Sequence, residues 1–112
     1  ITQKPWGSYQ ILEKEDTFIV KKLIINPGEE ISNQFHNHRN EHWILVSGSI
    51  TVFLEEKKYE MQSNEHLYIP KRSKHQIINP FDKIAVLIEV QSGSILQEDD
   101  IVRLSDKYQR DN

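Results

Sequence analysis

Residues 34–43 gather side chains that bind divalent metal ions. The stretch reads Gln-Phe-His-Asn-His-Arg-Asn-Glu-His-Trp and holds three of the five histidines in the chain. A further histidine, His75, stands much later, shortly after Pro70. Imidazole and carboxylate are the usual ligands of a catalytic divalent ion, and such sites commonly join a local cluster to a distant residue. The pattern therefore predicts a metal site.

The spacing limits which of these residues can share one ion. Alternate residues of a strand share a face, so Gln34, His36 and His38 would point the same way. Positions 34 and 38 would be about 13 Å apart, too far for one ion. The strand therefore supplies either Gln34 with His36 or His36 with His38. We expect Glu41, after a turn, and His75, from a later strand, to complete a nitrogen–oxygen shell with an open position.

The rest of the chain is typical of an all-β fold. Runs of β-branched and aromatic residues recur about every 8–12 residues, separated by turn clusters such as Asn26-Pro27-Gly28. We predict strands at Tyr9–Leu12, Phe18–Ile25, Ile31–His36, His42–Val46, Ser49–Leu54, Lys58–Met61, His66–Ile69, Gln76–Ile78 and Ala85–Val90. Only Ser105–Arg110 favours a helical turn. Many short strands that close on one another are typical of a small barrel or jelly roll with room for a ligand.

Composition narrows the class of protein. The 112 residues suit one domain, residues 1–112, and 28% charged with 37% apolar residues is a globular composition. A net charge of −3 gives no electrostatic attraction to nucleic acid or an anionic membrane. The absence of cysteine excludes disulfides and thiolate sites. Since the chain begins at Ile1 without a signal-peptide pattern, we expect a piece of a longer, cytoplasmic polypeptide.

One spacing pattern resembles the first motif of the cupin family. That motif runs Gly, five residues, His-x-His, three or four residues, Glu, six residues, Gly. The chain places Gly28, Gln34, His36, Glu41 and Gly48 at these positions. Gln34 takes the place of the first histidine.

A second pattern resembles the second cupin motif, which runs Gly, five residues, Pro-x-Gly, two residues, His, three residues, Asn. The chain places Asn64, Pro70, Arg72, His75 and Asn79 at these positions. Asn64 and Arg72 replace the two glycines, and asparagine tolerates positive φ better than arginine does.

Together the two motifs imply the cupin fold, a double-stranded β-helix or jelly-roll barrel. They also select the ligand set Gln34, His36, Glu41 and His75, with His38 in reserve.

A finer resemblance covers nearly the whole chain. Five segments together resemble the type II mannose-6-phosphate isomerase domain. They are Lys4–Tyr9, residues 34–48, Tyr68–Pro70, residues 89–93 and residues 98–103. Phe35 stands where that family usually has Met, and Ser49-Ile50 where Thr-Ala is usual, without loss of a functional group. The domain often follows a mannose-1-phosphate guanylyltransferase domain, so a fused or missing nucleotidyltransferase is an expected partner. The resemblance implies metal-dependent interconversion of mannose 6-phosphate and fructose 6-phosphate.

This reaction requires a base to move a proton from C2 to C1 and a cation for the phosphate. His38 and His42 are the candidate bases by proximity, and one of the two could instead orient a metal ligand. Arg39, together with Arg103, is predicted to bind the sugar phosphate, since guanidinium suits bidentate phosphate contacts.

One divalent ion per chain is expected. Zinc is the first choice, with manganese, cobalt or iron as alternatives, because the shell mixes nitrogen and oxygen. We also expect a homodimer. The N-terminal segment Ile1–Tyr9 is apolar and aromatic for a free terminus, and the edge strands of small β domains need covering, so we expect this segment to pack on or exchange with a second subunit.

Two other functions fit the same fold. One is a non-catalytic cupin that binds a metal and a sugar or sugar phosphate, and the other is a cupin oxygenase with iron at this site. The presence of His38, Arg39 and His42 beside the four ligands favours the isomerase. Oxygen chemistry needs no cation for a phosphate, so dependence on the substrate phosphate would separate the oxygenase from the isomerase.

Overall fold

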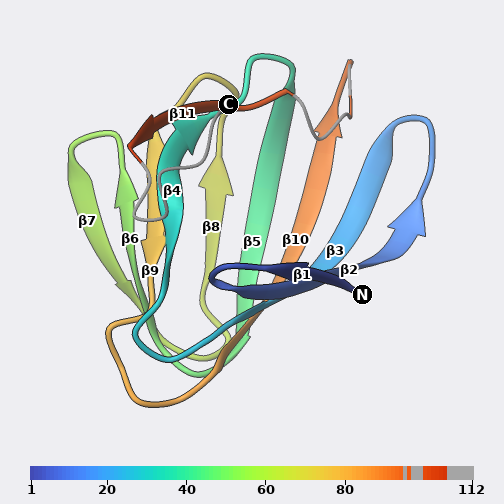
Figure 1. Ribbon diagram of the computed structural model, residues 1–112. Helices are drawn as coiled ribbons and strands as arrows, with labels where there is room; N and C mark the ends of the chain where they lie inside the picture. The colour runs from blue at the N-terminus through green and yellow to red at the C-terminus, as the bar shows by residue number, and fades with distance from the viewer. Residues whose placement is uncertain (95, 97–99, 106–112) are drawn as a thin grey trace.

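The computed structural model describes residues 1–94, 96 and 100–105, and the strands of this part form two antiparallel sheets (Figure 1). The six-stranded sheet runs β1 (Thr2–Lys4), β2 (Gly7–Lys14), β3 (Phe18–Ile25), β10 (Ala85–Gly93), β5 (Arg39–Ser47) and β8 (His66–Ile69). The five-stranded sheet runs β11 (Val102–Ser105), β4 (Glu30–Phe35), β9 (His75–Ile78), β6 (Ile50–Leu54) and β7 (Lys57–Met61).

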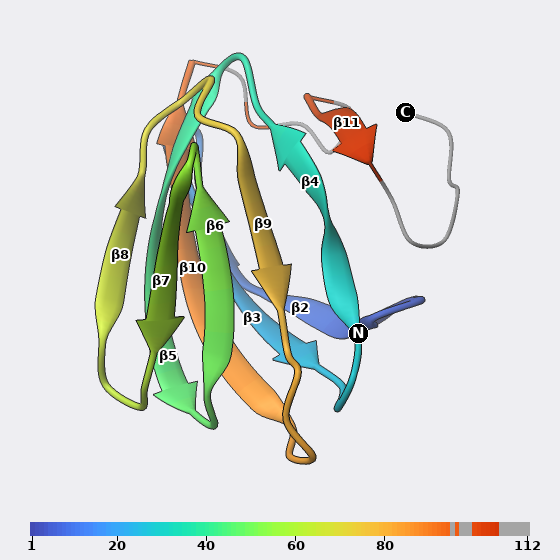
Figure 2. The same cartoon turned by 90° about the vertical axis from the view of Figure 1, so that its left-hand side faces the viewer.

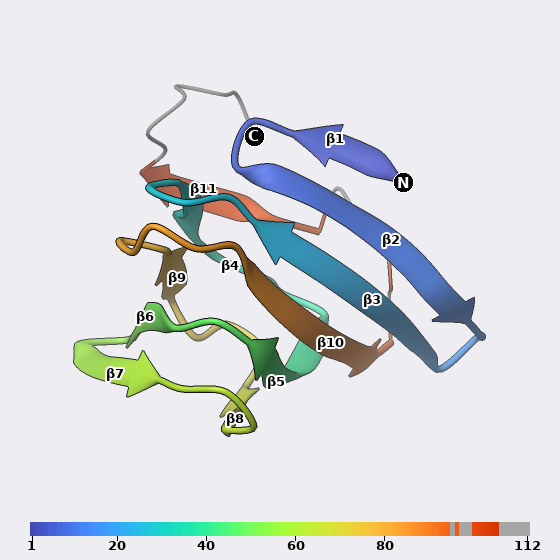
Figure 3. The same cartoon turned by 90° about the horizontal axis from the view of Figure 1, so that it is seen from below.

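The two sheets face each other around a common interior. Figure 2 shows the five-stranded sheet in front, and Figure 3 shows both sheets curving about the space between them. From β3 to β6 the chain alternates between the sheets at each step, as in a jelly roll. The predicted all-β barrel is therefore confirmed. In the described part of the chain, no helix is long and apolar enough to cross a membrane.

Each of the nine predicted strands is present; two have the predicted ends, and the ends of the others differ by at most three residues. Two edge strands were not predicted. β1 is short and polar, without alternation, yet Thr2 pairs with Tyr9 in a hairpin. β11 pairs with β4, placing Arg103 opposite Gln34. β11 ends at Ser105, and the remainder of the predicted helical turn, residues 106–110, lies outside the described residues.

The interior is apolar at one end and polar at the other. Toward the start of β10 and along its partner strands the buried residues are apolar, and they include Leu23, Ile25, Leu45, Ala85 and Leu87. Toward the end of β10 they are polar, and they include Lys21, Glu41, Glu89 and Gln91, with Gln34 and His75 lining the same cavity. Burying the first set stabilises the barrel, whereas buried polar groups need partners or a ligand. The fold thus separates an apolar core from a polar cavity.

Two loops adopt the backbone that the motif positions require. Asn64 and Arg72, which replace the motif glycines, have φ of 75° and 67°. The Arg72 N–H donates to the carbonyl oxygen of His36 at 2.7 Å. The loop before β9 is therefore attached to the end of β4, which brings His75 beside His36.

Candidate metal centre

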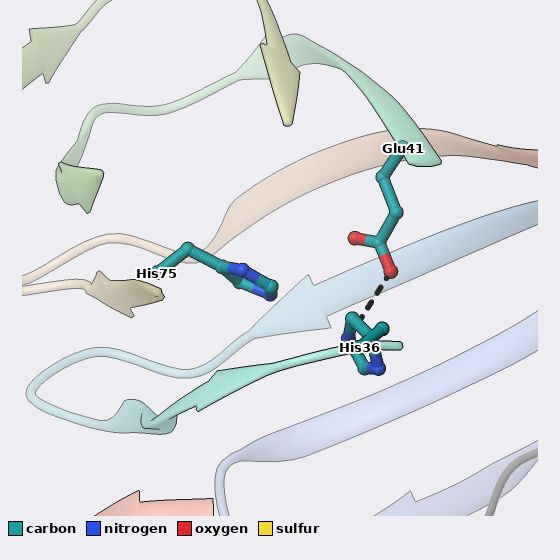
Figure 4. Close-up of side chains that lie close together, drawn as sticks. All are labelled: His36, Glu41 and His75. Carbon is teal, nitrogen blue, oxygen red and sulfur yellow. Dashed lines mark ion pairs between the residues drawn. The ribbon is translucent and has the colours of Figure 1, made fainter. Parts of the chain in front are cut away.

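Three buried side chains meet at the polar end of the interior. His36 directly follows β4, Glu41 lies on β5 and His75 begins β9. One ligand atom from each lies within 4.8 Å of the others. Figure 4 shows the three pointing toward one another, with His36 Nε2 3.3 Å from Glu41 Oε2. An ion bound at about 2.1 Å separates its ligand atoms by about 3–4 Å, so small movements suffice to close the shell.

Both imidazoles are oriented by backbone carbonyls. Nδ1 of His36 lies 2.5 Å from the Asp100 oxygen, and Nδ1 of His75 lies 2.9 Å from the Ser73 oxygen. A carbonyl only accepts, so this network assigns the ring proton to Nδ1 in both. Nε2 of each ring then carries the lone pair that can bind a metal, and in His36 it accepts a hydrogen bond from an Arg39 amino group at 3.2 Å. Such outer contacts are typical of metal-binding histidines.

The charge states also suit a cation. Burial alone would raise the pKa of Glu41, but the charges of Arg39, His75 and His36 outweigh it and lower that pKa to about 2. The carboxylate also accepts from Arg39 Nε and Trp43 Nε1, both at 2.9 Å. Burial lowers the pKa of His36 to about 4, although Glu41 opposes this shift. At neutral pH His36 is therefore neutral and Glu41 ionised, the forms that bind metal.

Gln34 stands beside this cluster. It is buried on β4, lies opposite His75 and lines the same cavity. Its Nε2 donates to the carbonyl oxygen and the hydroxyl of Ser32 at 3.3 and 3.2 Å. The amide oxygen Oε1 is the atom left to act as a fourth ligand.

The structure does not bring His38 and His42 to this site. β4 ends at Phe35, so strand alternation does not continue to His38, which is exposed. On β5 Glu41 points inward, and His42 therefore points outward, where its ring lies 4.6 Å from that of Tyr68. Neither histidine lines the cavity.

The two predicted substrate-binding arginines do line the cavity. Arg39 is buried and uses Nε and one amino group on Glu41 and His36. A guanidinium carries five N–H donors, and the contacts of Arg39 with Glu41 and His36 use two of them. Arg103 reaches the cavity from β11, opposite Gln34.

Several polar residues of the cavity wall were not predicted. They include Lys4, Tyr9, Lys21, Glu89 and Gln91. The signal was present in the alternation of the strands. Lys21 and Glu89 occupy the inward phase of β3 and β10, whose other inward residues are mostly apolar. A charged residue in that phase predicts a buried group with a chemical role.

Glu89 is the second buried carboxyl of the site, 5% exposed. Burial, and then the negative charge of Glu41, raise its pKa to about 8, against smaller opposing effects of Arg39, Gln91 and Lys21. Gln91 Nε2 donates to Glu89 Oε1. Gln91 Oε1 is buried and accepts no hydrogen bond from the described residues. Without a bound ion, the cavity wall thus holds a carboxyl whose pKa is raised toward neutrality and an amide oxygen that can accept from a ligand.

The jelly-roll barrel is the fold of the cupin class. A Cupin 2 conserved barrel domain protein from Salinispora arenicola superposes with a TM-score of 0.68. That match covers 77% of this chain and 75% of the other at 21% identity, which shows the fold alone. The family model described as mannose-6-phosphate isomerase C-terminal matches residues 2–106. The chain belongs to this family.

Longer curated proteins carry similar sequences. Alginate biosynthesis protein AlgA of Pseudomonas aeruginosa is 46% identical over 96% of this chain and 22% of its own length. Mannose-1-phosphate guanylyltransferase of Salmonella montevideo is 47% identical over 96% of this chain and 23% of its own length. The chain thus spans less than a quarter of the curated relatives it matches.

Proposed function

We propose that this domain catalyses the metal-dependent interconversion of mannose 6-phosphate and fructose 6-phosphate. The observation that carries the proposal is the meeting of three groups in one cavity. These are the His36–Glu41–His75 cluster, the proton-exchanging Glu89, and several cations. Membership of the mannose-6-phosphate isomerase C-terminal family supports the choice of substrate.

The metal would be held by His36, Glu41 and His75, with Gln34 Oε1 as a fourth ligand. Zinc is our first choice, and manganese, cobalt or iron suit the same mixture of nitrogen and oxygen ligands. When bound, a divalent ion polarises the carbonyl and hydroxyl oxygens of the sugar and stabilises negative charge that develops on them.

Glu89 is the base in this proposal, in place of the two histidines that lie outside the cavity. Its carboxylate takes the C2 proton of the open-chain aldose, the C2–H electron pair forms the C1=C2 double bond, and the π pair of the C1 carbonyl moves onto O1. The O2–H proton passes to O1, a lone pair of O2 then forms the carbonyl at C2, and the C1=C2 electron pair takes the proton back from Glu89 at C1. A pKa near neutrality suits a group that must both accept and donate.

Arg39 positions two metal ligands and offers its remaining N–H groups to sugar oxygens. Arg103 adds positive charge on the opposite wall of the cavity. Both therefore stay in the proposed substrate site, with Arg39 at the end where the carbonyl is held.

A metal-content measurement tests the site. Protein purified without chelator should carry one divalent ion per chain, and His36→Ala and His75→Ala should each lose most of it. Exposed His66 is the control, and His66→Ala should retain the ion. Isomerase activity should disappear with chelator and return with added metal. Undiminished metal in both site variants would refute the assignment.

We also propose that the domain works in the cytoplasm as the C-terminal part of a longer protein with a nucleotidyltransferase domain. The support is that its relatives are about four times longer and include mannose-1-phosphate guanylyltransferases. The reading frame upstream of Ile1 tests this proposal. An upstream sequence without a nucleotidyltransferase would contradict it.

A further inference from the structure

The concave face of the six-stranded sheet carries its charged groups in a fixed order. Glu89 on β10 lies directly opposite Lys21 on β3, and Glu41 on β5 lies opposite Gln91, two residues further along β10. From the strand spacing and rise, the Cα atoms of Glu41 and Lys21 are about 12 Å apart. Glu89 stands between them. The cluster, the base and a buried lysine thus follow one another across the sheet.

At the Lys21 end of this row of charged groups, the cavity wall holds a second lysine, Lys4. Lys21 is only 4% exposed, and its Nζ lies 4.5 Å from the centre of the Tyr9 ring. Lys4 Nζ lies 5.8 Å from the centre of the same ring. Both lysines and Tyr9 line the cavity. Two ammonium groups close to one ring concentrate positive charge on this side of the cavity, which suits an anion such as a phosphate.

The two arginines are placed differently. The Arg39 guanidinium is joined to Glu41 and His36, and Arg103 lies opposite Gln34. Both therefore lie beside the metal cluster, where the carbonyl end of the sugar has to be. C1 and C6 are the two ends of the open-chain hexose, so a phosphate on C6 extends away from these arginines.

We propose that Lys21 and Lys4, flanking Tyr9, form the subsite for the 6-phosphate of the substrate. The inference rests on the proposed isomerase function and adds the orientation of the sugar. C1 and C2 lie between the His36–Glu41–His75 cluster and Glu89, which must reach both carbons, and the phosphate lies at the N-terminal hairpin. Ammonium groups bind phosphate oxygens through charge-assisted hydrogen bonds.

A hexitol 6-phosphate tests the subsite, because it has the phosphate but no carbonyl to isomerise. Its affinity for the metal-loaded chain is measured by calorimetry beside that of the unphosphorylated hexitol. The variants are Lys21→Met and Lys4→Met, which keep most of the side-chain volume, and Lys21→Arg, which keeps the charge. Lys22→Met is the matched control, since Lys22 is the outward neighbour on β3.

We expect Lys21→Met and Lys4→Met to weaken hexitol 6-phosphate binding about tenfold or more, the effect of losing one charged hydrogen bond. Lys21→Arg should recover most of the affinity, and Lys22→Met should match the wild type. If Lys21→Met unfolds, the more peripheral Lys4→Met decides. Unchanged binding in the folded lysine variants, or equal wild-type affinity for the two hexitols, would overturn the subsite.

The result that would refute the isomerase proposal differs from the result that would refute the phosphate subsite. A wild-type chain that prefers hexitol 6-phosphate through Lys21 but forms no fructose 6-phosphate would support the subsite and refute the isomerase. Loss of phosphate preference in Arg103→Met, with none in the lysine variants, would place the phosphate at β11 and overturn the subsite.

Discussion

Glu41 and Glu89 are two buried carboxyls with opposite behaviour. Burial raises the pKa of both, but the pKa of Glu41 falls to about 2 because Arg39 and two histidines surround it. The pKa of Glu89 rises to about 8, since burial and the charge of Glu41 both favour its neutral form. Environments that separate two carboxyls in this way commonly assign them different roles in a reaction. In the proposed reaction Glu41 is a metal ligand and Glu89 the base.

These shifts predict how the stability of the metal-free protein changes with pH. The folded pKa of Glu89 lies above its unfolded value of 4.5, so the stability it contributes is lost as pH rises toward about 8. The folded pKa of His36 lies below 6.5, so its titration stabilises the protein between about pH 4 and 6.5 and opposes the first part of this loss. Above pH 6.5, Glu89 is the one of these two groups whose titration still changes the stability.

We therefore expect the free energy of unfolding of chelated protein to fall between pH 6.5 and 8. The slope attributable to Glu89 is at most about 1.4 kcal/mol per pH unit. Glu89→Gln should flatten this decline, because the amide does not titrate. Urea unfolding at several pH values measures both proteins. A parallel decline in the variant would show that Glu89 is not the group responsible.

At the scale of strands, the close approach of β10 and β5 positions Arg39. Gly93 lies opposite Arg39, and a Cβ there would lie 2.1 Å from the carbonyl oxygen of His38. At Gly28, whose φ is 75°, an added Cβ would meet nothing within 4 Å. The two glycines therefore serve different needs: Gly93 provides space and Gly28 provides backbone freedom.

Gly93→Ala should destabilise the protein by about 3 kcal/mol, because backbone must move to admit the methyl group. Gly28→Ala should cost about 1 kcal/mol, the price of positive φ for alanine. Gly93→Ala should also weaken metal binding, through displacement of Arg39. Chemical denaturation and metal titration of both variants test this. Equal effects of the two substitutions would contradict the role given to Gly93.

Strand alternation explains what the sequence predicts about the site and what it does not. His36, Glu41 and His75 are recognisable because their residue types and motif spacing suit a metal. The orientation of His38 was not predictable, since it depends on β4 ending at Phe35 and not continuing. Asp100 carries no local signal either. It meets the turn after β4 only through the fold, where its carboxylate accepts from the N–H groups of residues 37 and 38.

The strands themselves were predictable wherever an apolar face alternates, as in β3, β6 and β10. β1 and β11 lack that pattern, because they are short and lie at the edges of the sheets. The register between neighbouring strands could not be predicted from the sequence either. It is this register that places Lys21 opposite Glu89. The sequence therefore predicts the barrel and the three side chains that meet in the cluster, whereas the order of groups across the cavity requires the fold.

At the scale of the whole molecule, the outer face of the six-stranded sheet is the surface we expect to form a homodimer. Ile44, Val46 and Tyr68 are each nearly half exposed on β5 and β8. The N-terminal segment is already paired within its own sheet through Thr2 and Tyr9. Exposed apolar groups gathered on one face favour association.

Light scattering at micromolar concentrations should therefore give the mass of a dimer. Ile44→Lys should shift the protein to monomer, because a charge would be buried without a partner. Ile84, 50% exposed in the loop before β10, is the control, and Ile84→Lys should remain a dimer. A monomeric wild type would contradict the homodimer, and a dimeric Ile44→Lys would exclude this face.

The central claim is that the cluster and Glu89 together isomerise a sugar phosphate in this cavity. The most direct measurement is the rate of fructose 6-phosphate formation from mannose 6-phosphate by metal-loaded protein, compared between the wild type and Glu89→Gln at equal metal content. We predict turnover by the wild type and a loss of about 10²–10⁴-fold in the variant, the usual contribution of a general base. No turnover with zinc, manganese, cobalt or iron, or equal rates in the two proteins, would contradict the account.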